Sequence, residues 1–185
     1  AAKYGFKPGD NKYADLDGDG SITSSDREII GHTSPKLSYG FDNTITYKDF
    51  TLDILLQGVS GNKILNTTYA AGCTVLSDAP AITIKDGLNY WTEDNQNAYF
   101  ANPLSSTNKN YVVSTEYLQS GSYLKLKNIA LSWLLKKDRS KFADIKFTIS
   151  AQNLFCITGY KGYDPEVTTY SGDTNGGLDM GAYPN

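Results

Sequence analysis

Strict alternation of apolar and polar residues is the feature of this 185-residue sequence that most constrains its fold. It occurs in four segments, which are 37–47, 50–57, 122–135 and 145–152. Successive side chains of a β-strand point to opposite faces, so each segment is predicted to be a strand with one apolar and one polar face. All six prolines fall outside these segments, as the hydrogen-bond ladder of a sheet requires.

The four segments are predicted to pair as two antiparallel hairpins. The first hairpin turns tightly at Lys48-Asp49, and the second turns through the polar stretch 136–141. In the third segment the apolar positions change parity partway along the strand. A β-bulge near Asn128 would account for that change.

Long stretches rich in glycine, asparagine and serine follow each hairpin, at 58–120 and 153–185. A connection of about sixty residues is far longer than the usual 2–6, which indicates a functional loop or a small excursion domain. Short helical pieces are expected at 62–70 and 86–93.

Short turns at one end, long loops at the other and half-apolar strands of about ten residues are typical of an outer-membrane β-barrel. No stretch approaches the ~20 apolar residues of a membrane helix. Aromatic residues near the predicted strand ends fit an interfacial girdle: Tyr39, Phe41, Tyr47, Phe50, Tyr123, Trp133 and Phe155. Periodicity alone leaves open a soluble antiparallel sheet with an aromatic core.

The segment 15–26 matches the twelve-residue loop that binds calcium in EF-hands. Its candidate ligands are Asp15, Asp17, Asp19, Ser21, Thr23 and Asp26. Three carboxylates within five residues repel one another unless a hard cation neutralises them. No entering helix precedes the loop, and an exit helix is expected over 24–30, as in a dockerin-like half motif. The alternative is a solvated acidic turn held by Asx hydrogen bonds.

Charge and cysteine content narrow the function classes. The formal net charge is −3 and the sequence pI is about 5.1, which argues against a dedicated nucleic-acid binder. Cys73 and Cys156 lie far apart without neighbouring ligands, so a zinc site is not expected. One disulfide and two buried thiols both remain open.

Catalytic motifs are missing from the sequence, so no enzyme activity is expected. His32 is the only histidine and has no flanking nucleophile motif. The carboxylates of Asp164 and Glu166 flank a proline in an extended turn and point apart. Binding is favoured instead, because rings beside amides and carboxylates suit sugars or peptides. The candidates for substrate binding are Tyr90, Trp91, Tyr99, Phe100 and Tyr163, unless these rings only pack the loops together.

Four ordered motifs carry a resemblance to a known family. They are residues 13–64, beginning YADLDGDGSITSSD, then SYLKLKNIALSW at 122–133, AQNLFCITGYKGYDPEV at 151–167 and GAYP at 181–184. Together they resemble the C-terminal region of the SusC/RagA family of TonB-linked outer-membrane proteins.

That resemblance implies an all-β fold of antiparallel strands in a transmembrane β-barrel, the closing strand lying beyond Asn185. Hairpins are expected at 37–57 and 121–153. Residues 1–36 with the calcium loop and its short helix, 58–120, and 154–185 are expected to be extracellular loops. A chain that opens without methionine is expected to be a piece of a longer polypeptide.

The family further implies import of glycans or peptides through the outer membrane. The expected partners are the rest of the barrel and plug, a SusD-type lipoprotein, the TonB complex, an oligosaccharide or peptide ligand, and the lipid bilayer; nucleic acid is not one. Ca²⁺ is the expected cofactor. The alternative function is a soluble calcium-stabilised carbohydrate-binding β module, which would bury the apolar strand faces that a barrel exposes.

Overall fold

The computed structural model describes residues 4–73, 89–102, 113–140, 142–167 and 176–181. The chain divides into two compact units. The sheet unit comprises Thr33–Lys63 and Ser120–Tyr160, and the loop unit comprises Ala1–His32, Ile64–Gln119 and Lys161–Asn185.

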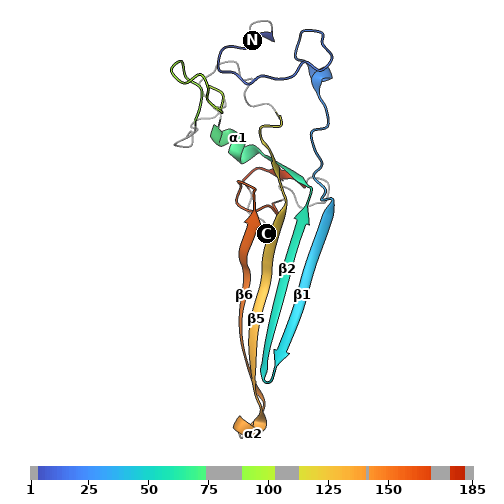
Figure 1. Ribbon diagram of the computed structural model, residues 1–185, viewed down its shortest axis with the longest axis vertical. Helices are drawn as coiled ribbons and strands as arrows, with labels where there is room; N and C mark the ends of the chain where they lie inside the picture. Colours follow the sequence, from blue (N-terminus) through green and yellow to red (C-terminus); the bar gives the residue numbers. More distant parts are fainter. Residues whose placement is uncertain (1–3, 74–88, 103–112, 141, 168–175, 182–185) are drawn as a thin grey trace. The chain divides into compact units, whose positions relative to one another are not determined.

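The sheet unit is a four-stranded antiparallel sheet in the order β1-β2-β5-β6 (Figure 1). Its strands are β1 Leu37–Tyr47, β2 Phe50–Ser60, β5 Tyr123–Leu135 and β6 Ile145–Thr158. They occupy the four alternating segments and continue beyond them, to Ser60 in β2 and to Thr158 in β6. The prediction of antiparallel strands is therefore confirmed.

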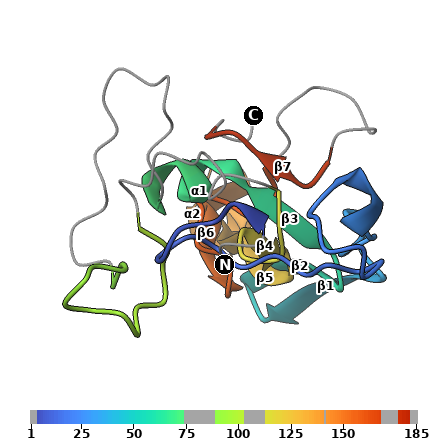
Figure 2. The same cartoon turned by 90° about the horizontal axis from the view of Figure 1, so that it is seen from above.

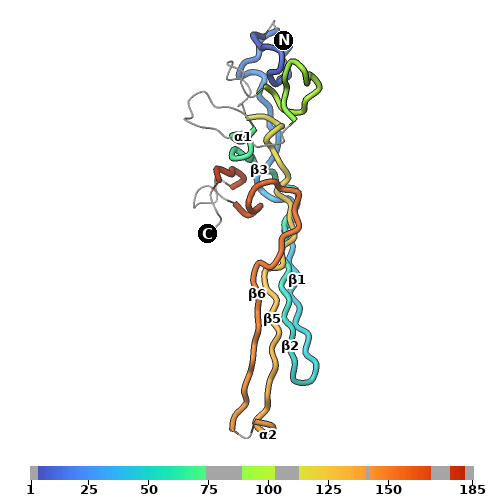
Figure 3. The backbone as a smooth tube through the Cα atoms, turned by 90° about the vertical axis from the view of Figure 1, so that its left-hand side faces the viewer, coloured from blue at the N-terminus to red at the C-terminus, as the bar shows by residue number. Residues whose placement is uncertain are grey.

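Both hairpin turns lie at the same end of the sheet (Figure 3). Lys48 takes a left-handed backbone conformation, with φ of 55°, as two-residue hairpin loops require. The second turn holds the short helix α2, Lys137–Ser140. The Leu134 amide donates to the Asp49 carbonyl oxygen at 2.8 Å, which ties the two turns together.

The strand register gathers the apolar side chains on one side of the sheet. Residues directly opposite one another in an antiparallel pair share a face. Phe50, for example, pairs with Trp133, and Trp133 pairs with Phe147. The resulting apolar face consists of Leu37, Tyr39, Phe41, Ile45, Tyr47, Phe50, Leu52, Ile54, Leu56, Leu124, Leu126, Ile129, Leu131, Trp133, Ile145, Phe147, Ile149, Ala151, Phe155 and Ile157.

Many side chains of this apolar face are exposed. Ile149 is 74% exposed and Phe147 is 54% exposed. A soluble sandwich would bury such residues against a second sheet. The opposite face is polar: Asp53, for example, accepts a hydrogen bond from the Thr44 hydroxyl at 2.6 Å.

The predicted bulge lies where the parity changes. The partners of β5 shift register between Leu126 and Asn128, and those of β2 shift between Leu55 and Leu56. Against β2, Lys127 is thus the extra residue of β5, and it allows both halves of the strand to turn their apolar side chains to the same face. Against β6 the extra residue belongs to β6, where Asn153 and Leu154 stand opposite Lys127.

Aromatic rings mark both ends of the apolar face. Near the turns, Phe50 stacks on Trp133 at 6.2 Å between ring centroids, and Trp133 stacks on Phe147 at 5.7 Å. At the other end Tyr39 lies over Gly58, and its hydroxyl donates to the Tyr123 carbonyl oxygen at 3.0 Å. A tyrosine of β1 therefore reaches across β2 to β5 where β2 has no side chain.

The loop unit has a small three-stranded sheet in the order β4-β3-β7. Its elements are β3 Lys63–Asn66, the helix α1 Thr67–Cys73, β4 Leu118–Ser120 and β7 Leu178–Asp179. β3 and β7 run parallel, and Figure 2 shows them next to one another. Its core cluster consists of Ala70, Cys73, Phe100 and Tyr117, with Leu65 and Tyr69 packed against it.

Two helix expectations need correction. Residues 63–66 form a strand, and the helix expected at 62–70 begins only at Thr67, because β3 pairs with β7. Of the stretch 86–93, residues 86–88 lie outside the described residues, and Tyr90 and Thr92 form isolated β-bridges. No helix in the described part of the chain has the length and apolar character needed to cross a membrane.

The cysteines take different environments. Cys73 is buried in α1, whereas Cys156 is exposed on β6, and neither forms a disulfide. The interpretation as two buried thiols is therefore right for Cys73 only.

Candidate functional site

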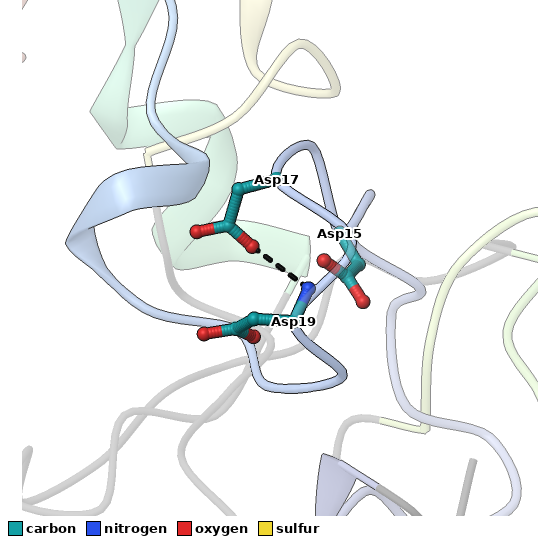
Figure 4. Close-up of side chains that lie close together, drawn as sticks. All are labelled: Asp15, Asp17 and Asp19. Atoms are coloured by element: carbon teal, nitrogen blue, oxygen red, sulfur yellow. Dashed lines mark hydrogen bonds between the residues drawn. The ribbon is translucent and has the colours of Figure 1, made fainter.

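The acidic loop draws three carboxylates together. Asp15, Asp17 and Asp19 each offer an oxygen that lies within 4.8 Å of the others (Figure 4). Two glycines with left-handed backbone, Gly18 at φ 77° and Gly20 at φ 88°, allow the chain to curl tightly around the carboxylates.

Backbone amides hold each carboxylate of this group in place. Asp15 accepts hydrogen bonds from the amides of Gly18 at 2.7 Å and Gly20 at 2.9 Å. Asp17 accepts from the Asp19 amide at 3.0 Å, and Asp19 accepts from the Ser21 amide at 2.6 Å. The loop therefore orients three negative groups toward one small volume.

Asp26 closes the loop from its far end and stands outside the group of three carboxylates. Its two oxygens accept hydrogen bonds from the amides of Leu16 and Thr23, both at 2.7 Å. The Thr23 amide first, and then the Leu16 amide, lower the pKa of this carboxyl group. Asp26 and Thr23 also form a capping box, in which the Thr23 hydroxyl accepts from the Ser25 amide at 3.1 Å.

The exit helix expected over 24–30 is wrong in length. Only a 3₁₀ turn forms, at Ser24–Asp26, and Arg27 is already extended. Ile29 is 82% exposed, so it makes no apolar packing contact that would stabilise a longer helix. The loop thus keeps the spacing of a calcium loop but not the helix of a dockerin-like half motif.

The candidate aromatic residues divide into packed and exposed rings. Phe100 is buried and lies edge-on to Tyr99, at 4.9 Å between centroids. Trp91 packs on Gly9, where a Cβ atom would come within 2.5 Å of the indole ring. These two rings fit the interpretation as loop packing. Tyr90, Tyr99 and Tyr163 are exposed, so loop packing does not bury their rings.

Tyr163 also lines a pocket of about 340 Å³ in the loop unit. Of the described residues, those that line it are Asn66, Thr68, Tyr69, Gly72, Cys73, Lys161, Gly162, Tyr163 and Asp179. The Lys161 ammonium lies 5.3 Å from the centroid of the Tyr69 ring. Burial, followed by the neighbouring Cys73, raises the pKa of Tyr69 to about 12. The phenol therefore stays neutral and serves as an aromatic wall.

Sequence reasoning found Tyr163 but missed the other polar groups of this pocket. Asn66 and Asp179 come together because β3 pairs with β7, a contact that spans more than a hundred residues. Neither residue stands in a recognisable motif. The one local signal was an asparagine directly before a helix start, which is a common capping position.

The carboxyl of Glu116 belongs to a separate polar contact in the loop unit. It accepts a hydrogen bond from the Asn11 side-chain amide at 2.8 Å. Burial raises the pKa of Glu116, and the bond from Asn11 acts against that rise. This contact links two chain segments 105 residues apart and has a structural role.

Comparison with known proteins gives consistent results. No protein-family model matches the chain. TonB-dependent receptor P3 of Formosa agariphila is 34% identical over 96% of this chain, which corresponds to 18% of that protein. TonB-dependent receptor SusC of Bacteroides thetaiotaomicron is 25% identical over 96% of this chain and 17% of its own length.

Solved structures agree with these relatives. The RagAB peptide importer in its closed-closed state superposes with a TM-score of 0.67 and 27% identity, covering 89% of this chain and 18% of the RagAB chain. Its open-open state gives the same TM-score with 26% identity. The chain spans less than a fifth of the length of the relatives it matches. Similarity in sequence and in structure thus coincide over nearly the whole chain, and the chain resembles one region of the SusC/RagA type of TonB-dependent receptor.

Proposed function

We propose that this chain supplies part of the wall and part of the outer loops of a TonB-dependent importer of glycans or peptides in the outer membrane. The observation that carries the proposal is the apolar face of the sheet unit. It runs across all four strands and leaves side chains such as Ile149 exposed. Hydrocarbon is the environment in which such a face is stable without a covering sheet.

The two ends of the strands suggest an orientation. In outer-membrane barrels the short turns are periplasmic and the long loops are extracellular. By that rule the turns at Lys48-Asp49 and at α2 face the periplasm, and the loop unit faces the outside. The aromatic rings at both ends of the apolar face support the same arrangement, because aromatic girdles lie at the two membrane interfaces.

A Ca²⁺ ion is proposed as the ligand of the acidic loop. The oxygens of Asp15, Asp17 and Asp19 fit the preference of Ca²⁺ for hard oxygen donors. The Ser21 carbonyl, Thr23 and Asp26 are the further candidates for the shell. When bound, the ion would neutralise the repulsion among the three carboxylates, which makes its role structural.

The partners follow from the same proposal. A SusD-type lipoprotein would cover the outer loops, and the TonB complex would act through parts of the receptor outside this chain. The remaining strands of the barrel would pair with the outer edges of β1 and β6. Exposed rings in the loop unit, namely Tyr90, Tyr99 and Tyr163, are the residues proposed to contact an oligosaccharide or peptide.

Single charges on the two sheet faces test the proposal. In the full-length receptor, Ile54→Asp and Ile149→Asp each place a carboxylate on the apolar face. A charge at the bilayer midplane costs about 2–4 kcal/mol for basic groups and less for acidic ones. We expect both variants to be depleted from the outer membrane, as measured by immunoblotting of membrane fractions.

Ser150→Asp is the matched control, because it puts the same charge beside Ile149 but on the polar face. It should leave the receptor level unchanged. Normal amounts of both isoleucine variants would refute the assignment of the apolar face to lipid, and equal loss of all three would point to a general folding defect of the sheet instead.

A further inference from the structure

Asn66, one of the residues that line the pocket of the loop unit, has a buried hydrogen-bond donor that no described residue satisfies. Asn66 is 1% exposed. Its side-chain oxygen accepts a hydrogen bond from the Tyr69 amide at 2.8 Å, and its main-chain amide donates to the Tyr117 carbonyl oxygen at 3.0 Å. Its side-chain nitrogen Nδ2 makes no hydrogen bond within the described part of the chain. Buried polar groups of proteins are nearly always paired, so an orphaned donor in a pocket wall calls for a ligand.

The orientation of the Asn66 amide follows from its surroundings. The Tyr69 main-chain N–H can only donate, so the atom of Asn66 that faces it must be the oxygen. Rotating the amide by half a turn would set two donors against each other. Nδ2 is therefore a fixed donor, and the group that satisfies it must be an acceptor.

The other pocket residues narrow the chemistry of that acceptor. Lys161 adds a positive charge to the lining, and Tyr69 and Tyr163 add two aromatic rings. Asp179 adds a negative charge, and it accepts a hydrogen bond from the Gly181 amide at 2.7 Å. Because the lining includes one carboxylate as well as one ammonium group, it disfavours a multiply charged anion such as a phosphate. The volume of about 340 Å³ is at the lower end of small-molecule sites.

We propose that this pocket binds a carboxylate or an amide carbonyl, with the oxygen accepting from Asn66 Nδ2 and Lys161 complementing a negative charge. The tyrosine rings flank the rest of the bound group. The group has two possible sources, a small molecule from outside and another segment of the same receptor. The inference does not depend on the importer proposal, because every residue that carries it belongs to the loop unit.

Binding measurements on the purified full-length receptor in detergent test the first source. The probes are N-acetylglycine, which has a carboxylate, and N-acetylglycinamide, which has amide carbonyls but no charge. Calorimetry measures the binding affinity of each probe. Asn66→Asp keeps an acceptor for the Tyr69 amide and replaces the orphaned donor with an acceptor. We expect this substitution to lower the binding affinity for both probes by at least about tenfold. Lys161→Met should weaken N-acetylglycine more than N-acetylglycinamide.

Gln96→Glu is the matched control, since it makes the same change of charge on the exposed surface of the loop unit. It should bind both probes as the parent receptor does. Equal probe affinity in the parent and in Asn66→Asp would overturn the inference.

A high-resolution structure of the full-length receptor tests the second source. If neither probe binds, we expect a carbonyl or carboxylate oxygen of another receptor segment at hydrogen-bonding distance from Asn66 Nδ2. No probe binding, together with only a water molecule, an apolar side chain or no atom beside Nδ2, would overturn the inference.

Discussion

The two units of the chain place their apolar residues in opposite ways. In the sheet unit the strands are long and paired with their neighbours, yet Phe147 and Ile149 on its apolar face are exposed. In the loop unit most of the described chain is irregular, yet Phe100 and Tyr117 are buried in a cluster around α1. Regular secondary structure and a buried core therefore do not coincide in this chain.

The contrast shows which interactions hold each unit. The sheet is held by its backbone ladder, whose three strand pairs keep continuous register apart from the bulge. The loop unit is held by side chains that reach main-chain groups, as when the Thr67 hydroxyl donates to the Asp179 carbonyl oxygen at 2.6 Å. A unit of the first kind tolerates an apolar environment wherever its backbone groups are paired, as they are between neighbouring strands of this sheet. A unit of the second kind is suited to water.

Removing the proposed calcium ligands is the most severe change and should affect the loop unit alone. Asp17→Ala combined with Asp19→Ala deletes two of the three converging carboxylates, so we expect calorimetric Ca²⁺ binding to disappear. Asp138→Ala with Asp144→Ala removes the same number of charges from the turn region of the sheet unit and should bind Ca²⁺ normally. Undiminished binding in the first variant would remove the calcium proposal.

A methyl group at Gly58 should disturb the sheet unit alone. Its Cβ would lie 2.4 Å from the Tyr123 carbonyl oxygen and 2.5 Å from the Tyr39 ring. Overpacking of this kind costs about 1–3 kcal/mol, so Gly58→Ala should lower the urea midpoint of the receptor in detergent. At Gly40 on the neighbouring strand a Cβ would lie 3.8 Å from the nearest atom, so Gly40→Ala is the control. Equal midpoints for the two variants would show that the Tyr39 contact is not tight.

Alkaline pH should lower the stability of the loop unit, because Tyr69 must then ionise in a partly buried site. Burial raises its pKa from 10.0 to about 12, so the folded state favours the neutral phenol. The corresponding stability is complete below pH 10 and is lost as the pH rises through about 12. Titration of ¹³Cζ-labelled tyrosine by NMR should show late resonances for Tyr69 and for Tyr117, whose pKa burial also raises, and the Tyr69 resonance should be missing in Tyr69→Phe. A Tyr69 resonance that titrates at pH 10 would contradict its burial.

The ion pairs between the hairpin turns should contribute least. Asp49 lies 3.2 Å from the Lys136 ammonium and 3.3 Å from the Arg139 guanidinium, and both basic side chains are exposed. Exposed pairs are worth about 0.2–1 kcal/mol, so Asp49→Asn should shift the urea midpoint only slightly, and less in high salt. A shift as large as that of Gly58→Ala would mean that the turns, rather than the ladder, stabilise the sheet unit.

The sheet unit was largely predictable from the sequence, because a period of two is a local property of each strand. The alternation in 37–47 and 50–57 and the parity change near Asn128 both have direct structural counterparts. Resemblance to SusC/RagA receptors is confirmed by the relatives and by the solved structures. The convergence of Asp15, Asp17 and Asp19 was also predictable, since the three residues lie close together in the sequence. Their binding of Ca²⁺ stays a prediction.

The pocket and the length of the exit helix were not predictable. Asn66, Lys161 and Asp179 meet only through tertiary pairing, so no window of sequence contains them together. The exit helix ends at Asp26 because Ile29 finds no core to pack on, although the local sequence permits two helical turns. Features that depend on neighbouring residues could be predicted from the sequence pattern. Features that depend on packing between distant segments could not.

The extra residue of β5 has a consequence for how such a strand can change over time. The register shifts at Lys127, and the regular alternation resumes on both sides of it. The bulge therefore confines the effect of the extra residue to Lys127. The apolar side chains of β5 on both sides of it still lie on the apolar face. A strand with a bulge can gain one residue while its apolar face stays continuous.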